Sequence, residues 1–125
     1  MTDWLDIALW IAQFLLAAIF LLAGTVHAFR YETARERLPW VKDLPRGIVV
    51  LDGVMEIVGG LGVVLPQLTG ILPWLTPLAA IGLAAIMIIA MSLHARRKEY
   101  SAIGLPGLLF ALAVFVAYGR WFLIP

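Results

Sequence analysis

Two carboxylates, Asp52 and Glu56, stand inside an apolar run that has no other charged residue. Their spacing of four residues places both on one face of a helix, one turn apart. An ionised carboxylate in apolar surroundings is costly unless it is paired or hydrated. We therefore expect this face to point into the fold, where each carboxylate takes up a proton or finds a cation. A structural hydrogen bond between helices is the alternative for both residues.

Two histidines end other apolar runs, His27 the first and His94 the third. Both histidines are expected on the same side of the membrane, close to the depth of Asp52. The four titratable groups are therefore predicted to converge. Such a cluster could bind a polar head group, pass a proton or hold a metal, although a helix dipole alone also favours histidine at a C-terminus. No metal site is predicted, because no local motif such as H-E-x-x-H occurs and only the two carboxylates share a helix.

Two further polar residues lie inside apolar runs. Arg120 stands beside Tyr118 and Trp121 near the end of the last run. We expect its guanidinium to extend to the membrane surface, with the alternative that it reaches inward to a ligand or a carboxylate. Gln13, in the first run, is expected to make a structural hydrogen bond to a neighbouring helix.

The amino-acid composition indicates that these apolar runs lie in lipid rather than in water. Hydrophobic residues make up 63% of the 125 residues and charged residues only 14%, which is too little polar surface to cover a water-soluble domain. A helix needs about 20 apolar residues to cross a bilayer. Four stretches of that kind are present, at about 4–29, 47–65, 74–94 and 104–124. The sequence thus predicts an all-α integral membrane four-helix bundle that forms a single transmembrane domain over residues 1–125, with no nucleic-acid site.

The distribution of basic residues predicts the orientation. Of the nine Lys and Arg residues, five lie in 30–46 and three in 96–98, whereas the connection between the second and third helices has none. Lys and Arg are retained on the cytoplasmic side during insertion. Trp4, Trp74 and Trp121 fall at the opposite interface, where indole rings are enriched. Both termini are therefore expected on the non-cytoplasmic side.

The segments GVMEIVGGLGVVLPQLTGILPWLTPLAAIGLAAIMIIAMSLHARRKEY and FVAYGR resemble the DoxX-like membrane proteins of bacteria, a four-helix family, and the likeness covers nearly the whole chain. Its most specific elements are Glu56 before a glycine-rich turn, His94 at a helix end and the closing Tyr118, Gly119 and Arg120. The resemblance implies a bacterial inner-membrane protein. Its relatives are linked to quinone-coupled oxidation of sulfur compounds or to membrane oxidoreductase complexes.

Two positions depart from the family pattern. A lysine is common where His27 stands, and an aliphatic residue is more usual at Asp52. Both departures fall in the predicted cluster, where a protonated His27 can still supply a positive charge.

Three functions remain open at this point. The first is a quinone-linked redox accessory subunit or lipophilic small-ligand site, in which Glu56, His27 and His94 hydrogen-bond the ligand and relay protons. Because the chain has no cysteine and no recognisable haem or flavin motif, electrons would come from a soluble oxidoreductase partner.

The second function is a proton-coupled small-solute transporter, working as a homo-oligomer through Asp52 and Glu56. The third is a structural adaptor whose basic loops hold a soluble partner or anionic lipid. No complete catalytic motif is present, so the sequence leaves open whether the protein is an enzyme.

Overall fold

The computed structural model describes residues 2–125, and its regular structure is entirely helical. The elements in chain order are α1 (Thr2–Phe29), α2 (Tyr31–Arg37), η1 (Pro39–Asp43), α3 (Arg46–Gly62), α4 (Leu65–Thr69), α5 (Leu75–Arg96), η2 (Tyr100–Ile103), α6 (Gly104–Tyr118) and η3 (Gly119–Leu123). Two of these are 3-10 helices, η1 and η2, and η3 is a turn of π-helix.

Four helical segments are long and apolar enough to cross a bilayer, which confirms the predicted all-α membrane fold. They are Asp3–Phe29, Arg46–Thr69, Leu75–Arg96 and Tyr100–Leu123, with mean hydropathies between 2.0 and 2.3. The shortest has 22 residues, and at about 1.5 Å per residue it spans a hydrocarbon core of about 30 Å. Large apolar side chains such as Leu22 and Ile89 lie on the outer surface, where only lipid would solvate them favourably.

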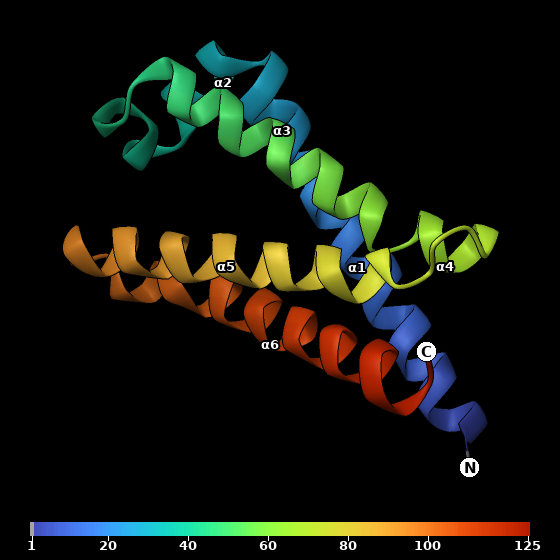
Figure 1. Ribbon diagram of the computed structural model, residues 1–125. Helices are drawn as coiled ribbons and strands as arrows, with labels where there is room; N and C mark the ends of the chain where they lie inside the picture. The colour runs from blue at the N-terminus through green and yellow to red at the C-terminus, as the bar shows by residue number, and fades with distance from the viewer. Residues whose placement is uncertain (1) are drawn as a thin grey trace.

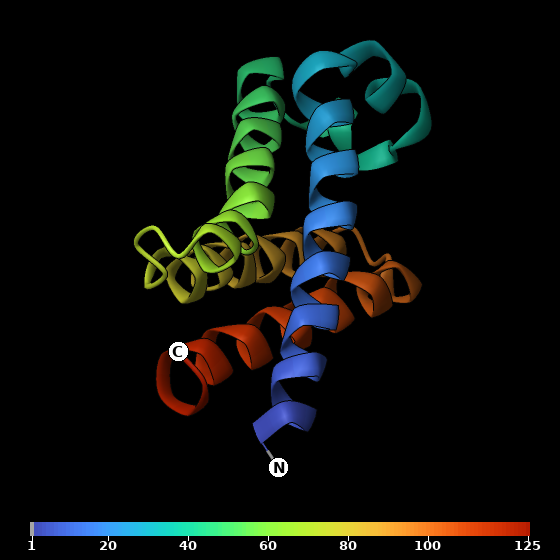
Figure 2. The same ribbon diagram turned by 90° about the vertical axis from the view of Figure 1, so that its right-hand side faces the viewer.

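The four long helices form two antiparallel pairs, α1 with α3 and α5 with α6, and contacts within each pair are the most extensive in the fold. Figures 1 and 2 show that the pairs cross at a large angle, approach each other near α4, and separate toward the opposite end. Both chain ends lie at the end with α4, which we name the terminal end (Figure 1). The connections 30–45 and 97–103 lie at the other end, which we name the basic end.

Two glycines bring the backbones of α1 and α3 into direct contact. A Cβ atom added to Gly53 would lie 2.5 Å from the Ala28 nitrogen and 2.7 Å from the Gly24 oxygen, and one added to Gly24 would lie 2.7 Å from the Gly53 oxygen. Small residues permit such an approach between membrane helices, which lack a hydrophobic driving force for association. This contact sets the position of α1 against α3.

The second membrane segment is interrupted, unlike the continuous helix to residue 65 that the sequence predicts. Pro66 has no N–H group, so it cannot donate to the Gly62 carbonyl one turn earlier. The Thr76 hydroxyl donates to that carbonyl at 3.2 Å, and the Gln13 side-chain amide donates to the neighbouring Val63 carbonyl at 2.7 Å. These two side chains satisfy backbone acceptors that lipid could not, and Gln13 makes the interhelical bond that was predicted for it.

The connection 30–45 folds back on the bundle. Its helices α2 and η1 contribute Ala34 and Val41 to a small buried cluster with Val49 of α3. Trp40, also in η1, lies edge-on to the ring of His27 with 5.3 Å between ring centroids. This connection therefore covers the basic end of the α1–α3 pair.

Candidate functional site

Three of the predicted titratable residues meet between α1 and α3. The Nδ1 atom of His27 lies 2.6 Å from Oε1 of Glu56 and 3.4 Å from Oδ2 of Asp52. His27 and Glu56 are buried, with 8% and 3% of their surface exposed, whereas the Asp52 side chain is 31% exposed. The face of α3 that carries the two carboxylates thus points inward, as the helical spacing predicts, and it meets His27.

The glycine contact explains why these side chains meet. Gly24 precedes His27 by three residues and Gly53 precedes Glu56 by three residues, so each glycine shares a helix face with its titratable neighbour. Because the two backbones touch at these glycines, the helix faces that carry His27 and Glu56 lie directly against each other, within reach of both side chains. The cluster is therefore positioned by the packing of α1 on α3.

A cavity of about 380 Å³ lies beside this cluster, between α3 and α5. His27, Asp52, Glu56 and His94 contribute its polar groups. The remaining lining is apolar and comprises Trp40, Leu44, Ile48, Val49, Leu51, Met55, Ile86, Met87, Ile89, Ala90 and Leu93. All four titratable residues that were expected to converge therefore line one cavity.

Part of the cavity wall is also part of the lipid-facing surface. Leu51, Met55 and Ile89 line the cavity and are 57%, 51% and 68% exposed. The cavity is lined mainly by residues of α3 and α5, two helices that belong to different pairs and separate toward the basic end (Figure 1). A lipophilic molecule could enter it sideways from the bilayer without crossing the aqueous loops.

His94 pairs with Glu99, whereas His27 pairs with Glu56 and Asp52. The Nδ1 atom of His94 lies 3.1 Å from Oε1 of Glu99, which also accepts a bond from Nε of Arg97 at 3.1 Å. Arg97 in turn pairs with Asp43 of η1, so this network joins the connection 30–45 to the end of α5. The hydrogen bond with His94, followed by that from Arg97, holds the pKa of Glu99 below its ordinary value.

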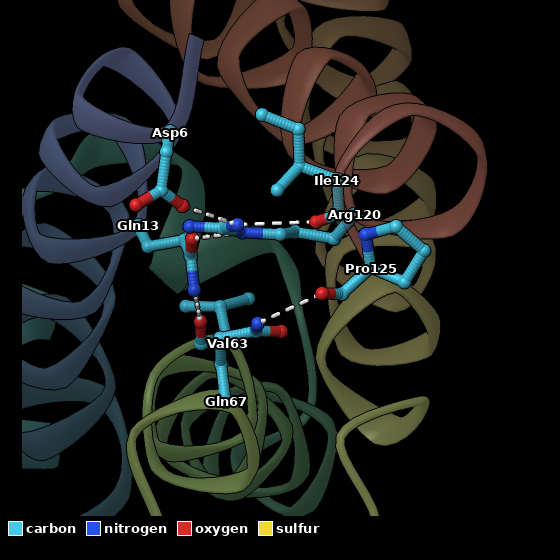
Figure 3. A network of polar contacts seen from close by, with 7 residues as sticks. All are labelled: Asp6, Gln13, Val63, Gln67, Arg120, Ile124 and Pro125. Carbon is cyan, nitrogen blue, oxygen red and sulfur yellow. Dashed lines mark hydrogen bonds and ion pairs between the residues drawn. The ribbon is translucent and has the colours of Figure 1, made fainter. Parts of the chain in front are cut away.

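Arg120 is buried at the terminal end, and the expectation that it extends to the membrane surface is wrong. Only 2% of the residue is exposed. Its Nε atom donates to Gln13 at 2.8 Å, while Nη1 donates to Asp6 at 2.8 Å and to the Ile124 carbonyl at 3.1 Å (Figure 3). The inward alternative therefore holds, and Arg120 ties η3 to α1 away from the cavity.

Several residues that position these groups were not singled out from the sequence. Asp6 is the carboxylate partner of Arg120, and its spacing of seven from Gln13 places both on one face of α1, a signal that was available. Glu99 and Trp40 contact the two histidines, but nothing in their local sequence indicates those partners.

The cluster also offers metal donors. One ring nitrogen of His27 and one carboxylate oxygen each from Asp52 and Glu56 all lie within 4.8 Å of one another. The expectation against a metal relied on the absence of a local ligand motif and on only the two carboxylates sharing a helix. In the fold, the contact between α1 and α3 brings the ligands together.

The model of the DoxX-like family matches residues 11–116, which include His27, Asp52, Glu56 and His94. Neither the curated proteins nor the solved structures give a match. The matched range covers most of the chain and includes the cavity. The chain belongs to the DoxX-like family, and its four apolar spans make it a multi-pass membrane protein.

Proposed function

We propose that this protein binds a lipophilic small molecule of the quinone class in the cavity between α3 and α5, and that it serves a redox complex of the bacterial inner membrane as an accessory subunit. The observation that carries the proposal is the combination of an apolar, lipid-adjacent cavity with a buried polar cluster at its side. Binding sites for small molecules typically have this composition, with few polar groups that orient the ligand.

The size of the cavity supports a ring-sized occupant. Its volume of about 380 Å³ falls in the range of about 300–1,000 Å³ that is usual for ligand sites. The ring would pack against Met87, Ala90 and Leu93 of α5. A hydrocarbon tail would pass between Leu51 and Ile89 into the lipid.

The polar groups suit a head group that carries oxygen atoms. The imidazole of His27 can donate from one nitrogen and accept at the other, and carboxylates accept from hydroxyl groups. Asp52 and Glu56 are held next to that imidazole, so a quinone carbonyl and a quinol hydroxyl both have partners. His94 supplies a further imidazole to the same cavity.

The redox role requires a partner. The chain has no cysteine, so electrons would reach a bound quinone from another protein. The basic end carries eight of the nine Lys and Arg residues and would face the cytoplasm by the positive-inside rule. That end offers a docking surface for a soluble oxidoreductase with an acidic face.

Binding is tested on the full chain in lipid nanodiscs, with a short-tailed ubiquinone and a short-tailed menaquinone as probes. Quenching of tryptophan fluorescence should saturate, because Trp40 lines the cavity. Ala90→Phe fills the cavity and should abolish saturation. Ala85→Phe adds the same side chain to the exposed surface of α5, outside the cavity, and should leave binding unchanged.

Two results would refute the proposal. One is quenching that never saturates in the unmodified protein, which would mean that the quinones only partition into lipid. The other is an equal loss in Ala85→Phe and Ala90→Phe. If Glu56→Gln and His94→Ala also preserve every activity of the host membrane, the adaptor function is favoured instead.

A further inference from the structure

The cluster of His27, Asp52 and Glu56 has an unbalanced charge. Two carboxylates share one imidazole, and no Lys or Arg among residues 2–125 forms an ion pair with either of them. Even a protonated His27 would leave one negative charge when both carboxylates are ionised. Uncompensated charge is strongly unfavourable where His27 and Glu56 are buried between membrane helices, so a bound cation would stabilise the cluster.

We propose that His27, Asp52 and Glu56 bind one divalent transition-metal ion, of the class of Zn²⁺, Mn²⁺ or Fe²⁺. The inference goes beyond the proposed ligand function and holds whether or not a quinone binds. It starts from the three ligand atoms, which already lie within 4.8 Å of one another.

The spacing of the ligand atoms fits a coordination sphere. Nitrogen and oxygen ligands lie about 2.0–2.2 Å from zinc, so two of them in tetrahedral geometry are about 3.5 Å apart. The distance of 3.4 Å between His27 Nδ1 and Asp52 Oδ2 already has this value. The 2.6 Å contact with Glu56 must open by about 1 Å, which rotation of the glutamate side chain provides.

The donor set selects the class of metal. Mg²⁺ and Ca²⁺ prefer sites built entirely from oxygen, whereas an imidazole nitrogen favours zinc, iron and their neighbours. One nitrogen with two carboxylate oxygens is therefore a mixed set for a borderline divalent ion. The absence of cysteine removes the thiolate ligands that would favour a softer ion.

The protein positions these ligands before any ion arrives. The backbone contact of Gly24 with Gly53 fixes α1 against α3, and Trp40 packs against the His27 ring. Three protein ligands leave at least one coordination position free. All three line the cavity, so water or the oxygen atom of a bound ligand would occupy that position.

Cobalt(II) is the probe for the test, because it replaces zinc and absorbs visible light. The full chain is purified without its affinity tag, stripped with a chelator and titrated with Co²⁺ alone. We expect a saturable absorption band at one equivalent per chain, which Zn²⁺ displaces and a large excess of Mg²⁺ does not. Metal content measured after desalting should confirm the stoichiometry.

Substitutions then assign the ligands. Asp52→Asn, Glu56→Gln and His27→Gln should each weaken Co²⁺ binding by at least about 100-fold, because losing even an outer-shell partner costs about 10–100-fold. His94→Gln is the matched control, since His94 lines the same cavity outside the three-residue set, and it should bind Co²⁺ normally. Circular dichroism and gel filtration confirm that each variant folds. If His27→Gln misfolds, Asp52→Asn at its partly exposed position decides.

Several outcomes would overturn the metal site. These are the absence of a saturable band in the unmodified protein, displacement of Co²⁺ by Mg²⁺ at equal concentration, or an equal loss in His94→Gln. Quinone binding is measured separately on chelator-treated protein. A saturable quinone signal without Co²⁺ binding refutes the metal site alone, and Co²⁺ binding without a quinone signal refutes the proposed function alone.

Discussion

The substitution Gly53→Ala disturbs the candidate site without removing any of its chemical groups. The added Cβ atom would lie 2.5 Å from the Ala28 nitrogen, 2.7 Å from the Gly24 oxygen and 2.9 Å from the His27 carbonyl carbon. All three neighbours are backbone atoms, so no side chain can rotate out of the way. The two helices must move apart.

The required movement follows from the nearest contact. Raising 2.5 Å to an ordinary van der Waals contact of 3.4 Å separates α1 from α3 by 0.9 Å. A similar shift between His27 and Glu56 lengthens their 2.6 Å contact to about 3.5 Å, beyond hydrogen-bond range. Overpacking of this kind costs about 1–3 kcal/mol, and the better helix propensity of alanine offsets about 1 kcal/mol. A net loss of about 1 kcal/mol, and at most about 2 kcal/mol, is expected.

The free energy of unfolding is measured in mixed micelles by titration with a denaturing detergent. Gly82→Ala is the matched control, because a Cβ at Gly82 meets no atom within 4 Å. It should leave stability unchanged or raise it by up to about 1 kcal/mol. The same shift would lengthen the 3.4 Å distance between His27 and Asp52 to about 4.3 Å, more than the about 3.5 Å between two ligands of a tetrahedral ion. In a Co²⁺ titration on both variants, only Gly53→Ala should therefore lose affinity.

An unchanged free energy of unfolding in Gly53→Ala, together with normal Co²⁺ affinity, would refute this reasoning. It would mean that the close approach of α1 and α3 does not position the cluster. A loss of stability with preserved Co²⁺ affinity would separate the packing of the helices from the geometry of the site.

Three further perturbations address the other features. Arg120→Met removes hydrogen bonds to Gln13, Asp6 and Ile124, and at about 0.6 kcal/mol for each bond in a membrane protein it should lower the free energy of unfolding by about 2 kcal/mol. Glu99→Gln should lower the melting temperature at pH 7. The difference from the unmodified protein should shrink as the pH falls below the ordinary carboxyl pKa of 4.5, because a carboxylate whose pKa is lowered in the fold stabilises the fold only while it is ionised. Single cysteines at exposed Ser101 and Thr69 should react oppositely with an impermeant maleimide in spheroplasts, Thr69→Cys at once and Ser101→Cys only after lysis.

The first two of these predictions have a control variant, and the third has an outcome that would contradict it. Arg37→Met removes an exposed charge from α2 and should leave stability unchanged, so an equal effect would contradict a special role for Arg120. Glu36→Gln, also exposed, should not reproduce the pH dependence of Glu99→Gln. Labelling of Ser101→Cys in intact spheroplasts would reverse the predicted orientation. The chain has no cysteine of its own, so the labelling needs no background correction.

The membrane fold was predictable because it depends on a local property of the sequence, the length and apolarity of each run. Apolar runs of spanning length have one low-energy solution in a bilayer, which is a helix. The inward face of α3 was predictable for the same reason, since the spacing of Asp52 and Glu56 and the cost of burying charge are both local facts. Neither prediction needs to know which helices are neighbours.

The partners of the buried groups depend on helix pairing, which local patterns do not contain. Arg120 could reach water or Asp6, and only the packing of η3 on α1 decides between them. His94 contacts Glu99 because the chain turns sharply after Arg97, where Lys98 adopts a φ of 58°. The meeting of His27 with Glu56, which are 29 residues apart in the chain, similarly depends on the contact of Gly24 with Gly53.

The two helix pairs have separate tasks at the cavity. His27, Asp52 and Glu56 all belong to α1 and α3, while α5 supplies a mainly apolar wall. Rotation of one pair against the other would therefore change the cavity volume available to a ligand, while the geometry of the His27, Asp52 and Glu56 cluster stays unchanged. Members of the family could accept ligands of different size through substitutions in α5 alone.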